Sequence, residues 1–228
     1  SPSEKKMLML SQRRWIERRE NYCGFEDGVA LAACITKETM ARRLLLRGAP
    51  ESGPGASSAL IPVFLQQRGD AKHYDLDYAL VRFANPQSAG EKLYNLQSEK
   101  ILAEASRGPH DQELLEGQML SHEESFAISF ASPDLLSVAD SFYAYEGAAH
   151  GNGGVTNINI NMRSGMEIRA SDVFAGEAIK SLTLACRDQI LARKQENYGA
   201  EKYVATEDGN YQESTITGHI NDFRRWTI

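Results

Sequence analysis

The stretch that decides the fold is a pair of strand-like runs joined by a glycine-rich loop. The first run is Ser137-Val138-Ala139-Asp140-Ser141-Phe142-Tyr143-Ala144, the loop is Tyr145-Glu146-Gly147-Ala148-Ala149-His150-Gly151-Asn152-Gly153-Gly154, and the second run is Val155-Thr156-Asn157-Ile158-Asn159-Ile160-Asn161. The glycines permit positive φ angles and a close approach of two backbones. The pattern therefore predicts two strands whose shared loop presents one histidine, His150.

Further strands and helices are expected on both sides of this pair. Alternation of apolar and polar residues indicates half-buried strands, and longer periodic stretches indicate helices. The predicted strands are 74–80, 125–130 and 166–168, with another beginning at 225–228; the predicted helices are 86–107, 111–119 and 172–194. Because runs of strands stand beside helices without strand–helix–strand alternation, the sequence predicts an α+β fold with an antiparallel sheet packed with helices.

The N-terminal segment has the pattern of a helical hairpin. Leu8, Trp15 and Tyr22 recur every seven residues, so residues 2–22 are expected to form an amphipathic helix with these side chains buried. A glycine-containing break precedes a second helix at 29–47. The predicted organisation is a helical segment at 1–48, a linker at 49–58 that is rich in Gly, Pro and Ser, and an α+β module at 59–228.

Charge is unevenly distributed along the chain. The net charge is −6, but residues 1–48 carry ten Lys and Arg against six acidic residues, a net +4, which leaves −10 for the remainder. An acidic body argues against a nucleic-acid partner and favours a basic one, although acidity also serves solubility alone. No apolar run reaches the length of a membrane span.

The three cysteines differ in their surroundings. Cys23 and Cys34 both lie in the helical segment, where they form either a disulfide in an oxidising compartment or two reduced thiols. Cys186 lies on the apolar face of a predicted helix and is expected to be a buried core thiol.

The residue patterns give little support to catalysis, a metal or a cofactor. No Gly-x-Ser-x-Gly elbow accompanies His150, and the five histidines lack metal-ligand spacing. Three roles for His150 stay open: a structural imidazole that hydrogen-bonds loop carbonyls, a binding residue, or the base of a hydrolase. The arginines at 13, 14, 18 and 19 are interpreted as a solvated helix face pairing with Glu17 and Glu20, with contact to an anionic polymer as the alternative.

Two segments resemble known families. Residues 10–23, Leu-Ser-Gln-Arg-Arg-Trp-Ile-Glu-Arg-Arg-Glu-Asn-Tyr-Cys, followed by Cys34 and by Arg43-Leu44, resemble the second half of an LprI-type lysozyme-inhibitor domain. Residues 134–138, 143–152 and 172–174 resemble the extracytoplasmic module of RsiV and PdaC, without its final strands. In the loop, Glu146 stands where that family has Thr, and Ala148 where it has a second Gly.

These resemblances imply a non-catalytic binding protein that is periplasmic, secreted or anchored to the envelope. The implied partner is a lysozyme-like muramidase, inhibited by steric occlusion. The expected binding residues are Tyr145, Glu146, Gly147, His150, Gly151 and Asn152, and the expected disulfide is Cys23 with Cys34. The alternatives are a peptidoglycan-binding or scaffolding module and, less favoured, a hydrolase that uses His150. No catalytic residue, metal or cofactor is predicted.

Overall fold

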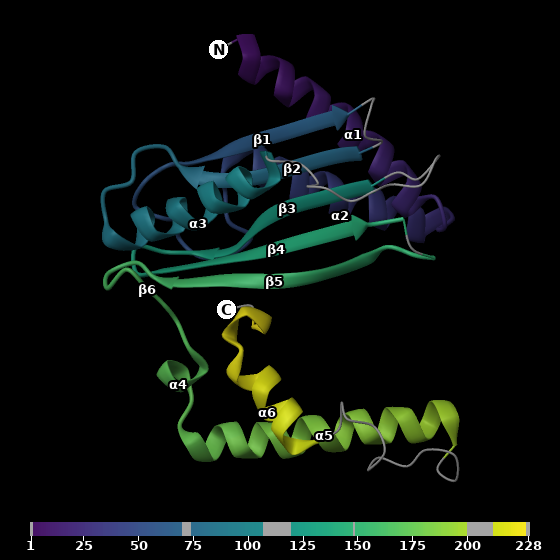
Figure 1. Cartoon of the computed structure of the whole chain (residues 1–228), viewed down its shortest axis with the longest axis vertical. Coiled ribbons are helices and arrows are strands. Elements are labelled where there is room, and N and C mark those ends of the chain that lie inside the picture. The colour runs from purple at the N-terminus through teal and green to yellow at the C-terminus, as the bar shows by residue number, and fades with distance from the viewer. Residues whose placement is uncertain (1, 70–73, 107–119, 148, 200–211, 227–228) are drawn as a thin grey trace. The chain divides into compact units, whose positions relative to one another are not determined.

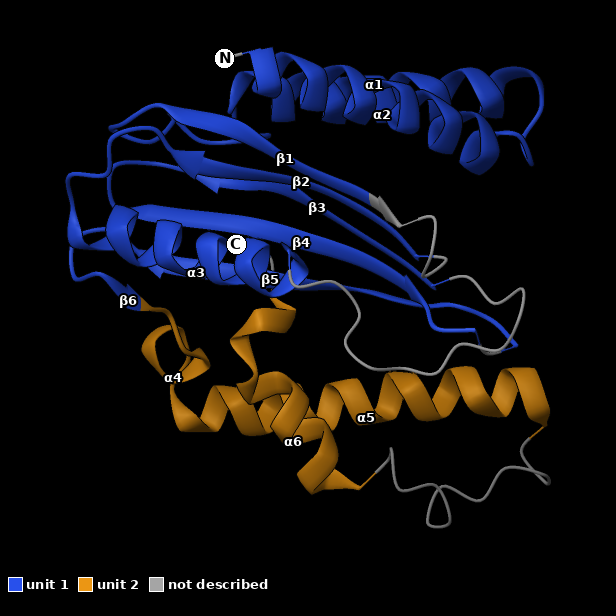
Figure 2. Ribbon diagram, turned by 45° about the horizontal axis from the view of Figure 1, so that its top comes forward, with its two compact units in different colours: residues 1–166, 228 blue, residues 167–227 orange. Residues whose placement is uncertain are grey.

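The computed structural model (Figure 1) describes residues 2–69, 74–106, 120–147, 149–199 and 212–226. The chain divides into two compact units, residues 1–166 with 228 and residues 167–227 (Figure 2). The division falls near the end of the sheet rather than near residue 48, and the sequence-based domain boundaries stay a prediction. The expected helix at 111–119 lies outside the described residues, as do residues 227 and 228 of the expected last strand.

The first unit is built on one sheet whose strands follow chain order. Its strands are β1 (Leu60–Gly69), β2 (Tyr74–Phe83), β3 (Leu120–Ala131), β4 (Leu135–Tyr145), β5 (Asn152–Asn161) and the short β6 (Met166–Glu167). β1–β2, β3–β4 and β4–β5 are antiparallel, which confirms the predicted α+β class with a mostly antiparallel sheet. β2 and β3 are parallel, contrary to expectation.

The parallel pair follows from the helix between its strands. α3 (Ala89–Ser106) connects β2 to β3. Parallel neighbours need such a crossover because the end of the first strand and the start of the second lie at opposite ends of the sheet. α3 covers one face of the sheet, and the hairpin of α1 (Pro2–Cys23) and α2 (Gly28–Arg47) covers the other (Figures 1 and 2). β2 contributes side chains to both faces of the sheet: Asp77 contacts Arg18 of α1, and Arg82 contacts Glu99 of α3.

The core lies where β2, β3 and β4 meet α3. Tyr94 of α3 is fully buried, and its hydroxyl donates to the carbonyl of Val81 at 2.9 Å. Its ring meets Phe83 edge-on, with the centroids 5.7 Å apart. Leu80, Leu136 and Val138 are also fully buried in this cluster. Burying such side chains contributes roughly 1.5–3 kcal/mol each, so this cluster holds the sheet against α3.

The hairpin approaches β1 closely at the end of α2. Gly48 ends the helix in the left-handed conformation, at φ 57°, and its amide donates to the carbonyl of Leu45. A Cβ at this position would lie 1.9 Å from the carbonyl oxygen of Leu60. Both the backbone angle and the contact require glycine. Beyond it, residues of the predicted linker bond to β3, since the amide of Glu51 donates to the carbonyl of Ile128.

β1 lies at one edge of the sheet and contains a proline. The amide of Ala84 donates to the carbonyl of Ala59, so in the antiparallel pair the backbone groups of odd-numbered β1 residues point toward β2. The backbone of Pro62 therefore points away from the sheet. A proline fits there because its missing N–H takes no bond from the ladder.

The second unit is helical. It comprises α4 (Ala170–Val173), α5 (Gly176–Tyr198), α6 (Glu213–Asn221) and the 3-10 helix η3 (Phe223–Arg225). Thr183 of α5 is buried, and its hydroxyl lies 3.3 Å from that of Thr217 on α6. Trp226 donates from Nε1 to the carbonyl of Ile220 at 2.9 Å. Cys186 is only half-buried, so it is less enclosed than the predicted core thiol.

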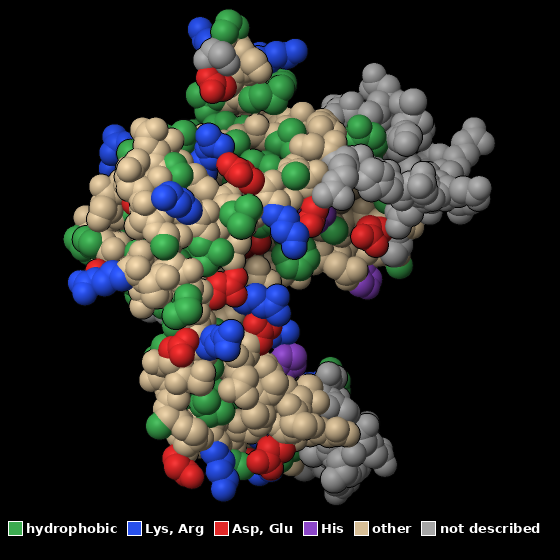
Figure 3. Space-filling model, turned by 60° about the vertical axis from the view of Figure 1, so that its left-hand side comes forward, with side chains coloured by type: hydrophobic (Ala, Val, Ile, Leu, Met, Phe, Trp, Pro, Cys, Tyr) green, Lys and Arg blue, Asp and Glu red, His purple; other side chains and the backbone are tan. Residues whose placement is uncertain are grey.

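Charged side chains of both signs are interspersed on the surface. On the face drawn in Figure 3, Lys and Arg side chains lie beside Asp and Glu side chains in each unit. None of the helices in the described ranges combines the length and apolar character that crossing a membrane requires.

Candidate functional site

The predicted binding residues lie together at the end of the β4–β5 hairpin. Tyr145 ends β4, Asn152 begins β5, and Glu146, Gly147, His150 and Gly151 lie between them. The pairing of Ala144 with Asn152 brings the two strands together at the base of the loop. Glu146, His150 and Asn152 are exposed. Tyr145, Gly147 and Gly151 are half-buried, so the structure brings the predicted residues together but exposes only half of them.

Tyr143, which the sequence-based site did not include, packs against the loop. A Cβ on Gly151 would lie 2.2 Å from the Tyr143 hydroxyl oxygen, and one on Gly153 would lie 3.4 Å from the Tyr143 ring. The ring therefore occupies space that these two glycines leave open. Tyr143 is still 45% exposed, so it forms part of the accessible surface. Tyr143 lies opposite Gly153 in the β4–β5 pair, and this pairing of an aromatic residue with a glycine is the signal that identifies it.

His150 makes little contact with the rest of the fold. Its side chain is exposed, and Nδ1 lies 3.1 Å from the carbonyl oxygen of the adjacent Gly151. This contact to a loop carbonyl is of the kind that the structural role predicted, and the exposure of the ring also leaves it accessible. Both roles therefore stay predictions.

β3 and β4 carry a pair of carboxyl groups on the face toward α3. Asp140 of β4 shares a side-chain hydrogen bond with Glu124 of β3, and Thr156 of β5 donates to it. Burial, followed by the charge of Glu124 and this hydrogen bond, raises the pKa of Asp140 to about 7. The Oδ1 atom of Asp140 is buried without a hydrogen-bond partner among the described residues. The pair therefore holds a proton near neutral pH.

Two further titratable side chains adjoin this carboxyl pair. Nε2 of His122 lies 3.3 Å from a carboxylate oxygen of Glu124, and the His122 ring stacks on Tyr78 with the centroids 5.3 Å apart. Burial and the charges of Glu124, Asp140 and Glu104 raise the pKa of the Tyr78 phenol, which stays neutral at physiological pH. Sequence reasoning missed this cluster, although the alternation of His122 and Glu124 along one strand placed both on one face.

Two of the four arginines of α1, Arg14 and Arg18, bind the sheet rather than facing solvent. Arg14 pairs with Asp75 and donates to the carbonyl of Leu76 at 3.0 Å. Arg18 lies 2.7 Å from Asp77 and 2.8 Å from Glu123. The expected solvated face with Glu17 and Glu20 was therefore wrong for Arg14 and Arg18, because the carboxylates of β2 and β3 take their place.

A groove of about 290 Å³ lies between the helical hairpin and the sheet. Its lining combines arginine and aromatic side chains with a floor of small sheet residues. The lining is Trp15, Arg18, Arg19, Tyr22, Glu38, Ala41, Arg42, Leu45, Ala79, Ser125, Phe126 and Ala127. Tyr22 is 67% exposed at this groove and so is not the core residue that its seven-residue spacing predicted.

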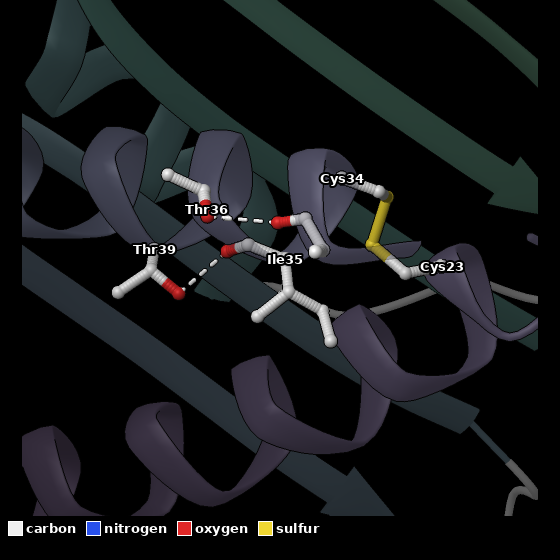
Figure 4. The surroundings of a disulfide bond; sticks show 6 residues. Cys23, Cys34, Ile35, Thr36 and Thr39 are labelled. Carbon is white, nitrogen blue, oxygen red and sulfur yellow. Dashed lines mark hydrogen bonds between the residues drawn. A yellow bond between two sulfur atoms is a disulfide. The ribbon is translucent and has the colours of Figure 1, made fainter. Parts of the chain in front are cut away.

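A disulfide joins Cys23 to Cys34 (Figure 4). It connects the last residue of α1 to the second turn of α2, across a sequence separation of 11 residues and a Cα–Cα distance of 5.7 Å. Thr36 and Thr39 donate their hydroxyls to the carbonyls of Ala32 and Ile35, each at 2.7 Å. The hairpin that carries the groove is thus covalently closed at one end.

Comparison with known proteins gives structural likenesses only. No family model matches the sequence. No curated protein matches it either. Among solved structures, the chain is similar to a DUF3298 family protein from Pseudomonas aeruginosa PAO1, with 18% identity and a TM-score of 0.42 over 60% of this chain and 68% of that one. It is also similar to a DUF3298 family member from Bacteroides fragilis NCTC 9343, with 15% identity and a TM-score of 0.42 over 63% of this chain and 71% of that one.

Proposed function

We propose that this chain is a non-catalytic, extracytoplasmic binding module whose partner is a lysozyme-type muramidase. The observation that carries the proposal is the end of the β4–β5 hairpin, where Tyr143, Glu146, His150 and Asn152 are all accessible. The residues of this loop are also those that resemble the RsiV/PdaC-type module. The LprI-like pattern of α1 independently suggests the same class of partner.

The form of the loop supports recognition of a concave enzyme. The loop connects two long paired strands, and the Tyr143 ring packs into the space left by Gly151. A loop held in this way loses little conformational freedom on binding, which favours affinity. The mechanism is steric: the loop enters the substrate cleft and excludes the glycan, with no covalent step.

Charge and the disulfide are consistent with this partner and location. The net charge of −6 attracts a basic muramidase and speeds the encounter at low ionic strength. The disulfide of Cys23 with Cys34 suits an oxidising compartment, such as the periplasm or the exterior. The proposed location is therefore periplasmic, secreted or attached to the envelope.

The proposal is tested by calorimetric titration of the chain into muramidases of different structural classes, with turbidity clearing of cell walls as the inhibition assay. Glu146→Lys should weaken binding at least tenfold, because it reverses a loop charge facing a basic partner. Glu196→Lys makes the same charge change at an exposed position on α5 and should leave binding within about twofold.

Each result of this titration decides for or against the proposal. Binding with inhibition that Glu146→Lys removes and Glu196→Lys preserves supports it. An equal loss in both variants assigns the effect to net charge and removes the loop from the interface. The absence of heat and of inhibition with every class at low salt contradicts the proposed partner.

A further inference from the structure

The groove between the hairpin and the sheet contains two guanidinium groups on one indole ring. The Cζ atom of Arg19 lies 4.9 Å from the Trp15 ring centroid, and that of Arg42 lies 5.9 Å from the same centroid. Arg19 is on α1 and Arg42 is on α2, so the two cations reach the groove from both helices. Such stacking favours each cation but leaves its in-plane N–H donors available.

Arg42 is a buried charge held by neutral groups. It is only 5% exposed, and it donates to the Ser11 hydroxyl at 3.0 Å and to the Gln12 side-chain oxygen at 3.2 Å. Among the described residues, no carboxylate forms an ion pair with it. Burial lowers the pKa of Arg42 to about 10, despite the nearby charge of Asp77. A cation enclosed without a paired anion is unfavourable, and an added anion offsets that cost.

Arg19 provides a second unmet donor. Its Nε atom is buried and has no hydrogen-bond partner among the described residues. Its closest carboxylate contact there is with exposed Glu20, at 3.9 Å, which is long for an ion pair. Arg18 differs, because Asp77 and Glu123 already neutralise it. The groove thus has one arginine with an unmet donor, Arg19, and one buried arginine, Arg42, whose charge is not paired with a carboxylate among the described residues.

The remaining lining defines the size and shape of a ligand. A volume of about 290 Å³ is near the lower limit of small-molecule pockets and matches a ligand of one ring with its substituents. Trp15 and exposed Tyr22 offer aromatic surfaces, and Ser125 and Glu38 offer hydrogen-bonding groups. The floor residues Ala79 and Ala127 are too small to fill the space.

We propose that this groove is a binding site for a small molecule that carries a carboxylate, with the acid group on Arg19 and Arg42 and its body against Trp15 and Tyr22. The carboxylate accepts from Arg19, whose Nε has no partner among the described residues, and it offsets the buried charge of Arg42. The site is separate from the β4–β5 loop and does not depend on a muramidase partner. A sugar acid and a peptide carboxylate share this chemistry.

Three probes test the contribution of the carboxylate to binding separately from that of the rest of the ligand. N-acetylmuramic acid and N-acetylglucosamine differ by a lactyl group that carries the acid, and N-acetyl-alanyl-alanine has a carboxylate without a sugar. Calorimetric titration of the full chain should show the muramic acid binding at least tenfold more tightly than N-acetylglucosamine. Tighter binding of the dipeptide than of the muramic acid would identify a peptide acid as the ligand and still supports the site.

Matched arginine variants locate the binding site. Arg19→Gln keeps the length of the side chain but removes its charge, and should weaken acid binding at least fivefold. Arg13→Gln, at an exposed position on the same helix that does not line the groove, should leave it unchanged. Muramidase binding should be unaffected by Arg19→Gln, which distinguishes this site from the loop.

Two outcomes would overturn the proposal. One is that neither acid binds at concentrations up to about 10 mM, or that N-acetylglucosamine binds as well as the muramic acid. The other is that Arg13→Gln weakens acid binding as much as Arg19→Gln does, since a diffuse basic surface would then suffice. If Arg19→Gln alters the thermal unfolding midpoint, Arg19→Lys provides the comparison, because it keeps the charge but not the forked donors of the guanidinium group. Full acid affinity in Arg19→Lys would count against the guanidinium contact.

Discussion

Arg18 and Asp77 form an ion pair that fastens the helical hairpin to the sheet, with Nη2 of Arg18 2.7 Å from Oδ2 of Asp77. Asp77 is only 3% exposed, and Gln66 donates to its other oxygen at 2.9 Å. Arg18 also contacts Glu123 at 2.8 Å, so the arginine has an alternative partner and the buried aspartate has a neutral one.

This asymmetry predicts unequal effects of removing the two partners. Arg18→Met should lower the free energy of unfolding by about 3 kcal/mol, because it leaves a buried carboxylate without a counter-charge. Asp77→Asn should cost only about 1 kcal/mol, because Arg18 keeps Glu123 and is partly solvated. Urea denaturation measures both values. A larger loss for Asp77→Asn would show that the aspartate, rather than the arginine, is the indispensable partner.

The disulfide should stabilise the hairpin through the unfolded state. Closing a loop between Cys23 and Cys34 removes chain entropy worth about 3 kcal/mol. The double variant Cys23→Ser with Cys34→Ser should lose about this amount, and dithiothreitol should have the same effect on the wild type but none on the variant. Cys186→Ser is the control: it keeps the Cys23–Cys34 disulfide, so it should lose as much stability in dithiothreitol as the wild type does.

Local patterns were sufficient for most elements. The seven-residue spacing of Leu8, Trp15 and Tyr22 predicted α1, although Leu8 and Tyr22 are exposed, because spacing identifies a helix face but not what covers it. Alternation predicted β2 and β3, although β3 begins at Leu120 rather than at residue 125, and the strand-like runs beside the glycine-rich loop predicted β4 and β5. β1 was missed because its apolar run contains Pro62 and follows a Gly- and Pro-rich stretch. α6 was missed because Thr215, Ile216 and Thr217 are β-branched and have low helix propensity.

The candidate sites differ in how far the sequence predicted them. The β4–β5 loop is local, so its residues were identified directly, apart from Tyr143. The groove joins α1, α2 and two strands that are distant in the sequence, and the carboxylate partners of Arg14 and Arg18 lie 59 to 105 residues away. Helix periodicity indicates which arginines share a face, but only tertiary pairing decides which of them are neutralised.

Stability should depend on pH through Asp140. Burial and Glu124 raise the pKa of Asp140 to about 7 in the folded chain, against about 4 when unfolded. Between pH 4 and pH 7 the folded chain holds a proton that the unfolded chain has released. The contribution of Asp140 to the free energy of unfolding is therefore fully present below pH 4 and is lost as the pH rises to 7. Asp140→Asn should flatten this dependence and raise stability at pH 8 by about 1–2 kcal/mol, allowing for solvent screening.

Urea titrations at pH 5, 6, 7 and 8 measure this pH dependence. Asp188→Asn, at an exposed position on α5, is the matched control and should keep the wild-type slope. Because Asp140 and Glu124 titrate as a pair, the slope belongs to both carboxyl groups. An unchanged slope in Asp140→Asn would mean that the proton resides on Glu124.

The fit of Tyr143 against Gly151 is tested by adding one methyl group. Gly151→Ala should displace the Tyr143 ring and cost about 1 kcal/mol, a modest value because the ring is partly exposed and can rotate. Muramidase binding should fall by more than this stability loss implies, since the ring is part of the proposed surface. Gly218→Ala, in α6 with no atom within 4 Å of the added methyl, should instead stabilise by about 0.5–1 kcal/mol.

The proline in β1 bears on how this chain behaves at high concentration. An edge strand of ten residues offers its outward N–H and C=O groups to any other strand, and neighbouring Ile61 and Val63 are apolar. Pro62 interrupts that outward row, because a second chain finds no donor at its position and meets the ring instead. The residue therefore disfavours the addition of a second chain's strand at this edge, and so opposes polymerisation through the sheet.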